Sequence, residues 1–219
     1  MSDPAEHGLK VAEYLLQIRA VELNPGNPFT WASGLRSPIY CDNRKTLSYP
    51  EIRRYIRDSF AHIIRHHYPG TEVIAGVATG GIAHGALVAE ALNLPFIYVR
   101  SEAKKHGLTN QVEGVIEPGQ KVVVVEDLIS TGKSSLNAVA ALNETGAEIL
   151  GMVAIFTYSF RKAADNFSEA GCGLHTLTHY DQLVQAAHGL NYISEEELSS
   201  LQEWRKDPEA WSAAYTQTH

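Results

Sequence analysis

The chain has 219 residues, which is long enough for one α/β domain, and 44% of them are hydrophobic while 20% are charged. These proportions are ordinary for a folded globular protein and argue against extended disorder. The formal net charge is −7, so the sequence lacks the overall basic excess that favours nucleic-acid binding.

The cysteines and the N-terminal residues indicate the compartment. Cys41 and Cys172 lie far apart and outside any C-x-x-C pattern, which argues against a disulfide scaffold or a zinc site and fits a reducing environment. The first residues carry neither a basic segment nor an apolar core, and no apolar run approaches the length of a membrane span. We therefore expect a cytoplasmic protein with no membrane partner.

Residues 7–43 contain the first predicted elements. Apolar residues recur at helical spacing from Leu9 to Leu16, which predicts an amphipathic helix, and Asn24–Pro28 then breaks the chain. Residues 29–43 contain two short β-like segments joined by a Ser-Gly turn. From this pattern alone, an edge hairpin that covers the core is the favoured interpretation.

The next helix and strand lead to a glycine-rich loop. Ser48–Glu51 has the sequence of a capping box and predicts the start of an amphipathic helix. Residues 72–77 predict a buried strand that opens into Thr79, Gly80 and Gly81 before a further helical segment. Glycines at the carboxyl end of such a strand let the backbone approach a ligand. Close packing of the helix against the strand is the alternative interpretation.

A group of cationic residues follows the predicted strand at residues 95–99. Three cations and a histidine stand within seven residues, namely Arg100, Lys104, Lys105 and His106. A charged run of this kind is often a solvated surface. The neighbouring glycine and the lack of apolar residues favour a mobile loop instead.

The chain is organised around residues 121–135, where four consecutive valines precede Glu126, Asp127 and a turn rich in small and hydroxyl-bearing residues. The valines predict a strand buried on both faces of a parallel sheet. Helical spacing begins after the turn and stops near Gly146. A strand end, such a turn and a helix N-terminus together form an anion site, because unpaired backbone N–H groups converge there.

Two kinds of phosphate ligand fit this pattern. Thr131–Ser134 matches half of the P-loop motif, but Asp127 stands where that motif needs its first glycine. Two acids before the turn suit a ribose 5-phosphate, whose hydroxyls donate to Glu126 and Asp127 while the turn binds the phosphate. The predicted binding segment continues through Leu128, Ile129, Ser130, Thr131, Gly132, Lys133 and Ser134.

The remaining segments suggest structure without chemistry. Residues 148–158 predict a core strand, residues 161–170 a helix and residues 174–177 a weak strand. The sequence is helical from Asp181 onward, and Ser194–Glu197 predicts a capping box.

Residues 122–134 resemble the phosphoribosyl-pyrophosphate (PRPP) motif of type I phosphoribosyltransferases, which has a hydrophobic run, two acids and a Thr-Gly turn. Thr79, Gly80 and Gly81 resemble the pyrophosphate loop of this family. The resemblance implies an α/β fold with a parallel, Rossmann-like sheet flanked by helices and a small N-terminal hood. A single domain over residues 1–219 is expected, with its hood at about 1–45, its core at about 46–180 and C-terminal helices at about 181–215.

Two further segments carry the resemblance. Arg100, Lys104 and His106 match the catalytic loop of the family, to which we add the adjacent Lys105. Residues 29–38 read F-T-x-x-S-G-x-x-S-P and are similar to the hood of orotate phosphoribosyltransferases, which covers the pyrimidine. This implies that orotate is bound by Phe29, Ser33, Tyr40 and Ser130. The sequence departs from members that carry lysines at Ala32, Gly80 and Ser101.

The resemblance implies transfer of the 5-phosphoribosyl group from PRPP to orotate, which gives orotidine 5-phosphate and pyrophosphate in pyrimidine (UMP) biosynthesis. Lys104, His106 and Asp127 are the expected catalytic residues. The expected cofactor is Mg²⁺ held mainly by PRPP. Because the catalytic loop of these enzymes acts on the neighbouring subunit, a homodimer with shared sites is expected. The alternatives are a phosphoribosyltransferase for another base and a non-catalytic PRPP sensor.

Overall fold

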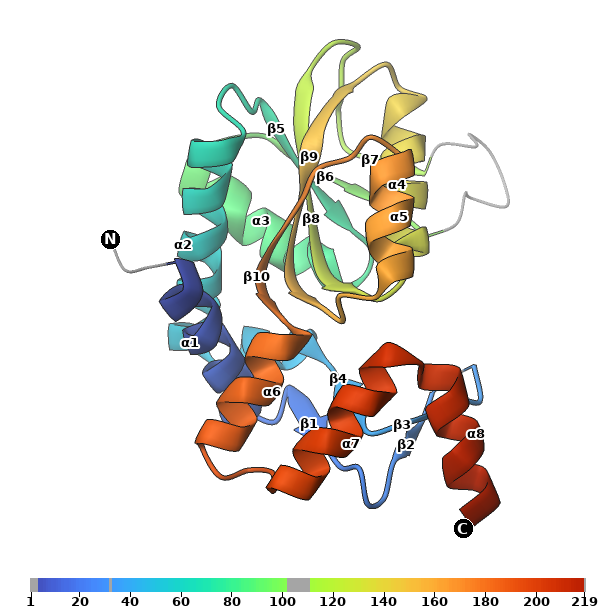
Figure 1. Cartoon of the computed structure of the whole chain (residues 1–219). Coiled ribbons are helices and arrows are strands. Elements are labelled where there is room, and N and C mark those ends of the chain that lie inside the picture. The colour runs from blue at the N-terminus through green and yellow to red at the C-terminus, as the bar shows by residue number, and fades with distance from the viewer. Residues whose placement is uncertain (1–3, 32, 102–110, 219) are drawn as a thin grey trace. The chain divides into compact units, whose positions relative to one another are not determined.

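The computed structural model describes residues 4–31, 33–101 and 111–218 (Figure 1). Its contacts divide the chain into two compact units. The core unit is Leu47–Leu177, and the terminal unit joins Met1–Thr46 to Thr178–His219. The single domain expected from the sequence stays a prediction. Among the described helices, none has both the length and the apolar character needed to cross a membrane.

A sheet of six strands forms the centre of the described fold. Strand β5 pairs in parallel with β6 and β8, and β8 pairs in parallel with β9, while β7 is antiparallel to β6. The predicted α/β class with a mostly parallel sheet is therefore confirmed. The strand order is β10 (Leu174–His179), β9 (Glu148–Thr157), β8 (Lys121–Ile129), β5 (Val73–Val77), β6 (Phe96–Val99) and β7 (Val112–Glu113).

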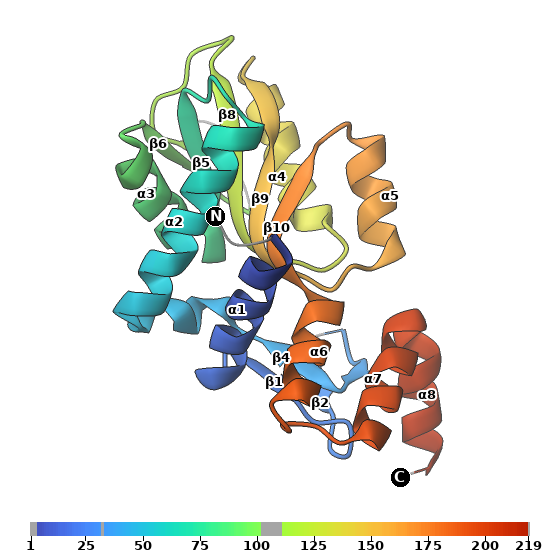
Figure 2. The same ribbon diagram turned by 60° about the vertical axis from the view of Figure 1, so that its left-hand side comes forward.

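Helices cover both faces of this sheet. Figures 1 and 2 place α2 (Pro50–His67) and α3 (Gly80–Leu92) on one face, and α4 (Lys133–Asn143) and α5 (Arg161–Glu169) on the other. The four valines of β8 are fully buried as a result. A strand covered on both faces has no polar side, which is why its sequence is a continuous apolar run instead of an alternating one.

Strand β8 is longer than the sequence predicts. We expected it to end before the two acids, but it continues through Glu126 and Asp127 to Ile129. The neighbouring β9 is ten residues long and pairs with this extension, with Glu126 opposite Ala154 and Ile129 opposite Thr157. Successive side chains on a strand point to opposite faces, so the two acids enter different environments.

Only one of the two predicted capping boxes forms. The Ser194 side chain accepts a hydrogen bond from the Glu197 N–H, and the Glu197 side chain accepts one from the Ser194 N–H, at the start of α7 (Glu195–Lys206). The prediction at Ser48 was wrong. Ser48 ends a 3₁₀ helix (Asn43–Ser48), and Tyr49 is the N-cap of α2 without a side-chain cap bond. Pro50 at the first helical position, whose fixed φ suits helix entry, starts α2 there instead.

The terminal unit contains short strand pairs and helices from both ends of the chain. Strand β2 (Phe29–Thr30) pairs antiparallel with β3 (Arg36–Ser37), and β1 (Val21–Leu23) pairs antiparallel with β4 (Ile39–Cys41), which confirms a hairpin in residues 29–43. Its turn contains Gly34 at φ +86°, a left-handed conformation that glycine adopts without a Cβ clash. The helices of this unit are α1 (Pro4–Gln17), α6 (Tyr180–Gly189), α7 and α8 (Pro208–Thr218).

The last helix is bonded to the hairpin region. The Arg36 N–H donates to Ser212 Oγ at 2.9 Å, and the Tyr215 hydroxyl donates to the Gly26 carbonyl at 3.1 Å. Figure 1 shows α8 beside β3. The C-terminal helix, for which the sequence predicts no chemistry, therefore helps to hold the N-terminal segment in place.

We expect His84 to weaken the protein in acid. His84 lies on α3 with 1% of its surface exposed, and burial lowers its pKa from 6.5 to about 4. Between pH 6.5 and pH 4, His84 is protonated in the unfolded chain and neutral in the folded chain. The free energy of unfolding therefore decreases as the pH falls. The loss approaches about 3 kcal/mol near pH 4. His84→Gln should therefore show a smaller decrease in the free energy of unfolding between pH 7 and pH 4.5, measured with urea. The exposed His62→Gln is the control, and an equal decrease in wild type and His84→Gln would contradict the expectation.

Candidate functional site

The candidate site lies at the carboxyl edge of the sheet, between β5 and β8. Strand β5 leads into α3 on one face, whereas β8 leads into α4 on the opposite face. Neighbouring parallel strands whose connections leave on opposite faces form a topological switch point, the usual place for a ligand in an open α/β sheet. Asp127, Gly80 and the turn after β8 all lie at this edge.

The turn after β8 has the backbone geometry of an anion site. Gly132 is the N-cap of α4 and has φ +76°, so the turn needs glycine there. Ser130 and Thr131 are partly exposed before it, and Lys133 and Ser134 are exposed in the first turn of the helix. The free N–H groups and the positive dipole end of a helix N-terminus favour a phosphate at such a turn.

The two acids are not equivalent. Glu126 is 6% exposed and both of its oxygens accept internal hydrogen bonds, Oε1 from the Asp127 N–H and Oε2 from the Ser135 hydroxyl, each at 2.9 Å. Burial, and secondly the charge of Asp127, raise the pKa of Glu126 well above its usual range. Asp127 is partly exposed. This arrangement favours a neutral Glu126 and leaves the negative charge on Asp127.

The first turn of α3 lies directly against the end of β8. A Cβ atom on Gly80 would overlap the Asp127 carboxylate, and one on Gly81 would overlap the Val125 carbonyl oxygen. The peptide bond between Ala78 and Thr79 is cis. The glycines therefore serve close packing and also bring Thr79–Gly81 next to the acid.

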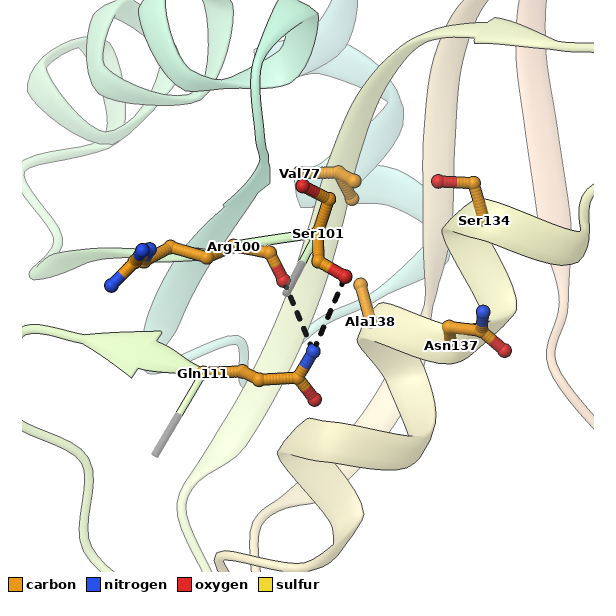
Figure 3. Close-up of a pocket in the computed structure, with 7 residues that line it drawn as sticks. All are labelled: Val77, Arg100, Ser101, Gln111, Ser134, Asn137 and Ala138. Carbon is orange, nitrogen blue, oxygen red and sulfur yellow. Dashed lines mark hydrogen bonds between the residues drawn. The ribbon is translucent and has the colours of Figure 1, made fainter. Parts of the chain in front are cut away.

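A small, partly open pocket lies beside this edge (Figure 3). Two predicted residues line it, Arg100 and Ser134. The Arg100 side chain points away from its centre, and its guanidinium lies 3.5 Å from a Glu113 oxygen. The remaining lining residues are Val77, Ser101, Gln111, Asn137 and Ala138.

Sequence reasoning did not identify two polar residues of this pocket. The Gln111 amide donates to the carbonyl oxygens of Arg100 and Ser101, each at 3.4 Å. Asn137 is exposed on α4 three residues after Ser134. Helical spacing from Ser134 could have indicated Asn137. The position of Gln111 in this pocket depends on the pairing of β6 with β7, which no local sequence pattern indicates.

Several predicted residues cannot be placed at this edge. Lys104, Lys105 and His106 lie outside the described residues, as does Ala32. Of the residues predicted to bind orotate, Ser130 belongs to the core unit, and the others belong to the terminal unit.

The three orotate-binding candidates of the terminal unit lie on the N-terminal hairpin and the strand after it. The rings of Phe29 and Tyr40 have centroids 5.6 Å apart at an interplanar angle of 37°, and Tyr40 is 42% exposed. Ser33 is exposed in the turn. An exposed aromatic edge suits a planar polar ring.

The described residues fit Mg²⁺ held largely by a phosphate ligand. They contain no group of three or more His, Cys, Asp or Glu side chains that could hold a metal ion by themselves. Mg²⁺ commonly uses one or two protein carboxylates together with substrate phosphates. Asp127, near the turn after β8, is the carboxylate that could take this part.

Comparison with known proteins gives consistent matches. A family model described as phosphoribosyl transferase domain matches residues 45–174. The chain is 59% identical over 202 residues to an orotate phosphoribosyltransferase of Cytophaga hutchinsonii, covering 92% of this chain and 97% of that protein. It is 55% identical over 204 residues to an orotate phosphoribosyltransferase of Porphyromonas gingivalis, with coverage of 93% and 97%.

A solved structure agrees with these sequence matches. The crystal structure of orotate phosphoribosyltransferase from Aeropyrum pernix superposes with a TM-score of 0.73 at 27% identity, and it covers 84% of this chain and 99% of that chain.

We expect Gly80→Ala to disturb Asp127. The added methyl group would occupy the space of the Asp127 carboxylate, so that side chain must turn away. If Asp127 holds a ribose hydroxyl, PRPP binding measured by calorimetry should weaken at least roughly tenfold, the cost of one hydrogen bond to a charged group. Gly189→Ala is the matched control, because no atom of the described residues lies within 4 Å of the position that its Cβ would take. Equal PRPP affinity in Gly80→Ala and wild type would show that this close contact is not needed.

Proposed function

This chain belongs to the phosphoribosyl transferase family and, within it, to the orotate phosphoribosyltransferases, and we propose that it transfers the 5-phosphoribosyl group from PRPP to orotate. The products are orotidine 5-phosphate and pyrophosphate, in pyrimidine biosynthesis. The observation that carries this proposal is the position of Asp127 near the end of β8, shortly before the turn that leads into α4, at the switch point between β5 and β8. A ribose 5-phosphate has hydroxyls for such a carboxylate and a phosphate for such a turn.

Binding of the ribose 5-phosphate part follows from the geometry of this edge. The backbone and hydroxyl groups of Ser130–Ser134 bind the 5-phosphate. Asp127 accepts hydrogen bonds from the ribose hydroxyls, and its charge favours the cationic character that C1 gains as its bond to pyrophosphate breaks. Glu126 supports Asp127 from the buried side, because it accepts the Asp127 N–H bond.

Departure of pyrophosphate requires positive charge and N–H donors. Thr79–Gly81 supplies backbone N–H groups, and Arg100 supplies a guanidinium after release from Glu113. Lys104, Lys105 and His106 add positive charge from the predicted catalytic loop. When bound, Mg²⁺ neutralises charge on pyrophosphate. The orotate ring nitrogen attacks C1 from the opposite face, so the configuration at C1 inverts.

Recognition of the base is assigned to Phe29, Ser33, Tyr40 and Ser130. The hood-like sequence at residues 29–38 and the relatives named orotate phosphoribosyltransferase both favour orotate over a purine. A PRPP sensor that regulates transcription would need a nucleic-acid surface, which the net charge of −7 disfavours. Location in the cytoplasm stays a prediction.

One absorbance assay tests this proposal. Purified protein is mixed with PRPP, Mg²⁺ and orotate, and the loss of orotate absorbance is followed beside reactions with adenine, hypoxanthine, uracil or no base. The proposal requires turnover with orotate and none with the other bases. Turnover with a purine would support the other phosphoribosyltransferase, and PRPP binding without any turnover would support the sensor.

Asp127 and Glu126 should respond differently to replacement by the corresponding amide. Asp127→Asn should lower kcat about a hundredfold, the effect of losing one preorganised electrostatic contact. Glu126→Gln should lower kcat less than about tenfold, because a neutral amide replaces an acid whose pKa is already raised by burial. Steady-state kinetics with orotate and PRPP measures both changes. Equal losses in the two variants would contradict the assignment of the charge to Asp127.

Mixing two inactive variants tests the proposed homodimer with shared sites. Asp127→Ala removes a ribose contact and Lys104→Ala removes a loop cation, so each alone should lose about a hundredfold in turnover. If the loop of one subunit completes the site of the other, mixed dimers contain one intact site. Subunit exchange should then restore up to about a quarter of the wild-type rate, since half of random dimers are mixed and each has one of two sites. Absence of recovery, with exchange verified by differently tagged subunits, would argue against shared sites.

A further inference from the structure

Helix α5 makes two contacts with the phosphate-binding turn. The Asn166 side-chain amide donates a hydrogen bond of 2.8 Å to the Thr131 carbonyl oxygen, across 35 positions in the sequence. The next residue, Phe167, is 5% exposed, and its ring lies 2.6 Å from the position that a Cβ of Gly132 would take. The first contact is with the peptide group between Thr131 and Gly132, and the second is with Gly132 itself.

The first contact determines the direction of an N–H group. The Thr131 carbonyl and the Gly132 N–H belong to one planar trans peptide group, in which C=O and N–H point in opposite directions. Because Asn166 holds the carbonyl toward α5, the Gly132 N–H points away from α5. Rotation of this peptide group would move the N–H and the carbonyl together.

A glycine in this position makes such support necessary. Gly132 has φ +76°, and glycine adopts positive and negative φ with similar ease, so its own backbone does not hold the turn in one conformation. Phe167 fills the space next to Gly132 and limits its movement. Asn166 is partly buried and Phe167 is buried, so neither is a freely moving surface side chain.

We propose that Asn166 is a positioning residue for the 5-phosphate of the ribose substrate. It holds the Thr131–Gly132 peptide group so that the Gly132 N–H is presented to the phosphate, and it acts without touching the substrate. This inference rests on the proposed function of the turn. It adds α5, for which the sequence predicts no chemistry, to the elements that determine affinity.

Two variants separate this role from general stability. Asn166→Ala removes the donor, and Asn166→Asp replaces it with an oxygen that faces the Thr131 carbonyl. Isothermal calorimetry would measure the dissociation constants of two probes, ribose 5-phosphate and magnesium pyrophosphate. We expect ribose 5-phosphate to bind about tenfold more weakly to Asn166→Ala, and more weakly still to Asn166→Asp, while pyrophosphate binding is unchanged. Asp165→Ala, on the same helix with an exposed side chain, is the matched control and should bind both probes as wild type does.

Kinetics provides a second readout that a structural defect would not imitate. A 5-phosphate contact is made equally in the ground state and the transition state, so its loss should raise the KM for PRPP with little change in kcat. Equal weakening of both probes would overturn the proposal, because it would indicate general damage to the fold. Unchanged ribose 5-phosphate affinity in Asn166→Ala would also overturn it. Failure of the wild-type protein to bind ribose 5-phosphate would instead refute the proposed function, on which the inference depends.

Discussion

The close approach of the first turn of α3 to the end of β8 is the constraint on which the candidate site depends. Gly80 leaves the space that the Asp127 carboxylate occupies, and Gly81 leaves the space of the Val125 carbonyl. These contacts join a donor-rich loop on β5 to the acid on β8. Residues that the sequence separates by almost fifty positions thereby come to share one edge of the sheet. A side chain at position 80 would displace the Asp127 carboxylate from its present position.

The paired acids show how a strand gives different properties to neighbouring residues of similar chemistry. Alternation along β8 turns Glu126 into the protein, toward Ser135, and leaves Asp127 partly exposed. Burial raises the pKa of the first acid, and the hydrogen bond from the Asp127 N–H ties the pair together. Two fully charged carboxylates on adjacent residues would repel each other. A neutral acid beside a charged one avoids that cost and still provides a negative charge for the substrate.

Features that depend on local pattern could be predicted from the sequence. The valine run predicted the central buried strand, the glycines predicted the two loops at its edge, and Ser194 predicted a helix start. Ser48 failed as a cap because Pro50 and Tyr49 offer a competing start for the same helix. The length of β8 could not be predicted, because pairing with β9 extends it.

Features that depend on long-range contacts could not be predicted. The bond from Asn166 to Thr131 and the pairing of Gln111 with the end of β6 join segments that show no common pattern. The family resemblance predicted which residues bind ligand. It did not indicate which parts of the fold hold those residues in position.

The composition of the terminal unit has a consequence for synthesis of the protein. Its two parts, Met1–Thr46 and Thr178–His219, are translated before and after the core unit. At about 5–20 residues per second, the segment between them takes on the order of ten seconds to translate. During that time the nascent N-terminal hairpin lacks Ser212 and Tyr215, its later hydrogen-bond partners. The core unit can therefore fold before the terminal unit, whose N-terminal part is completed only after residues 178–219 have been translated.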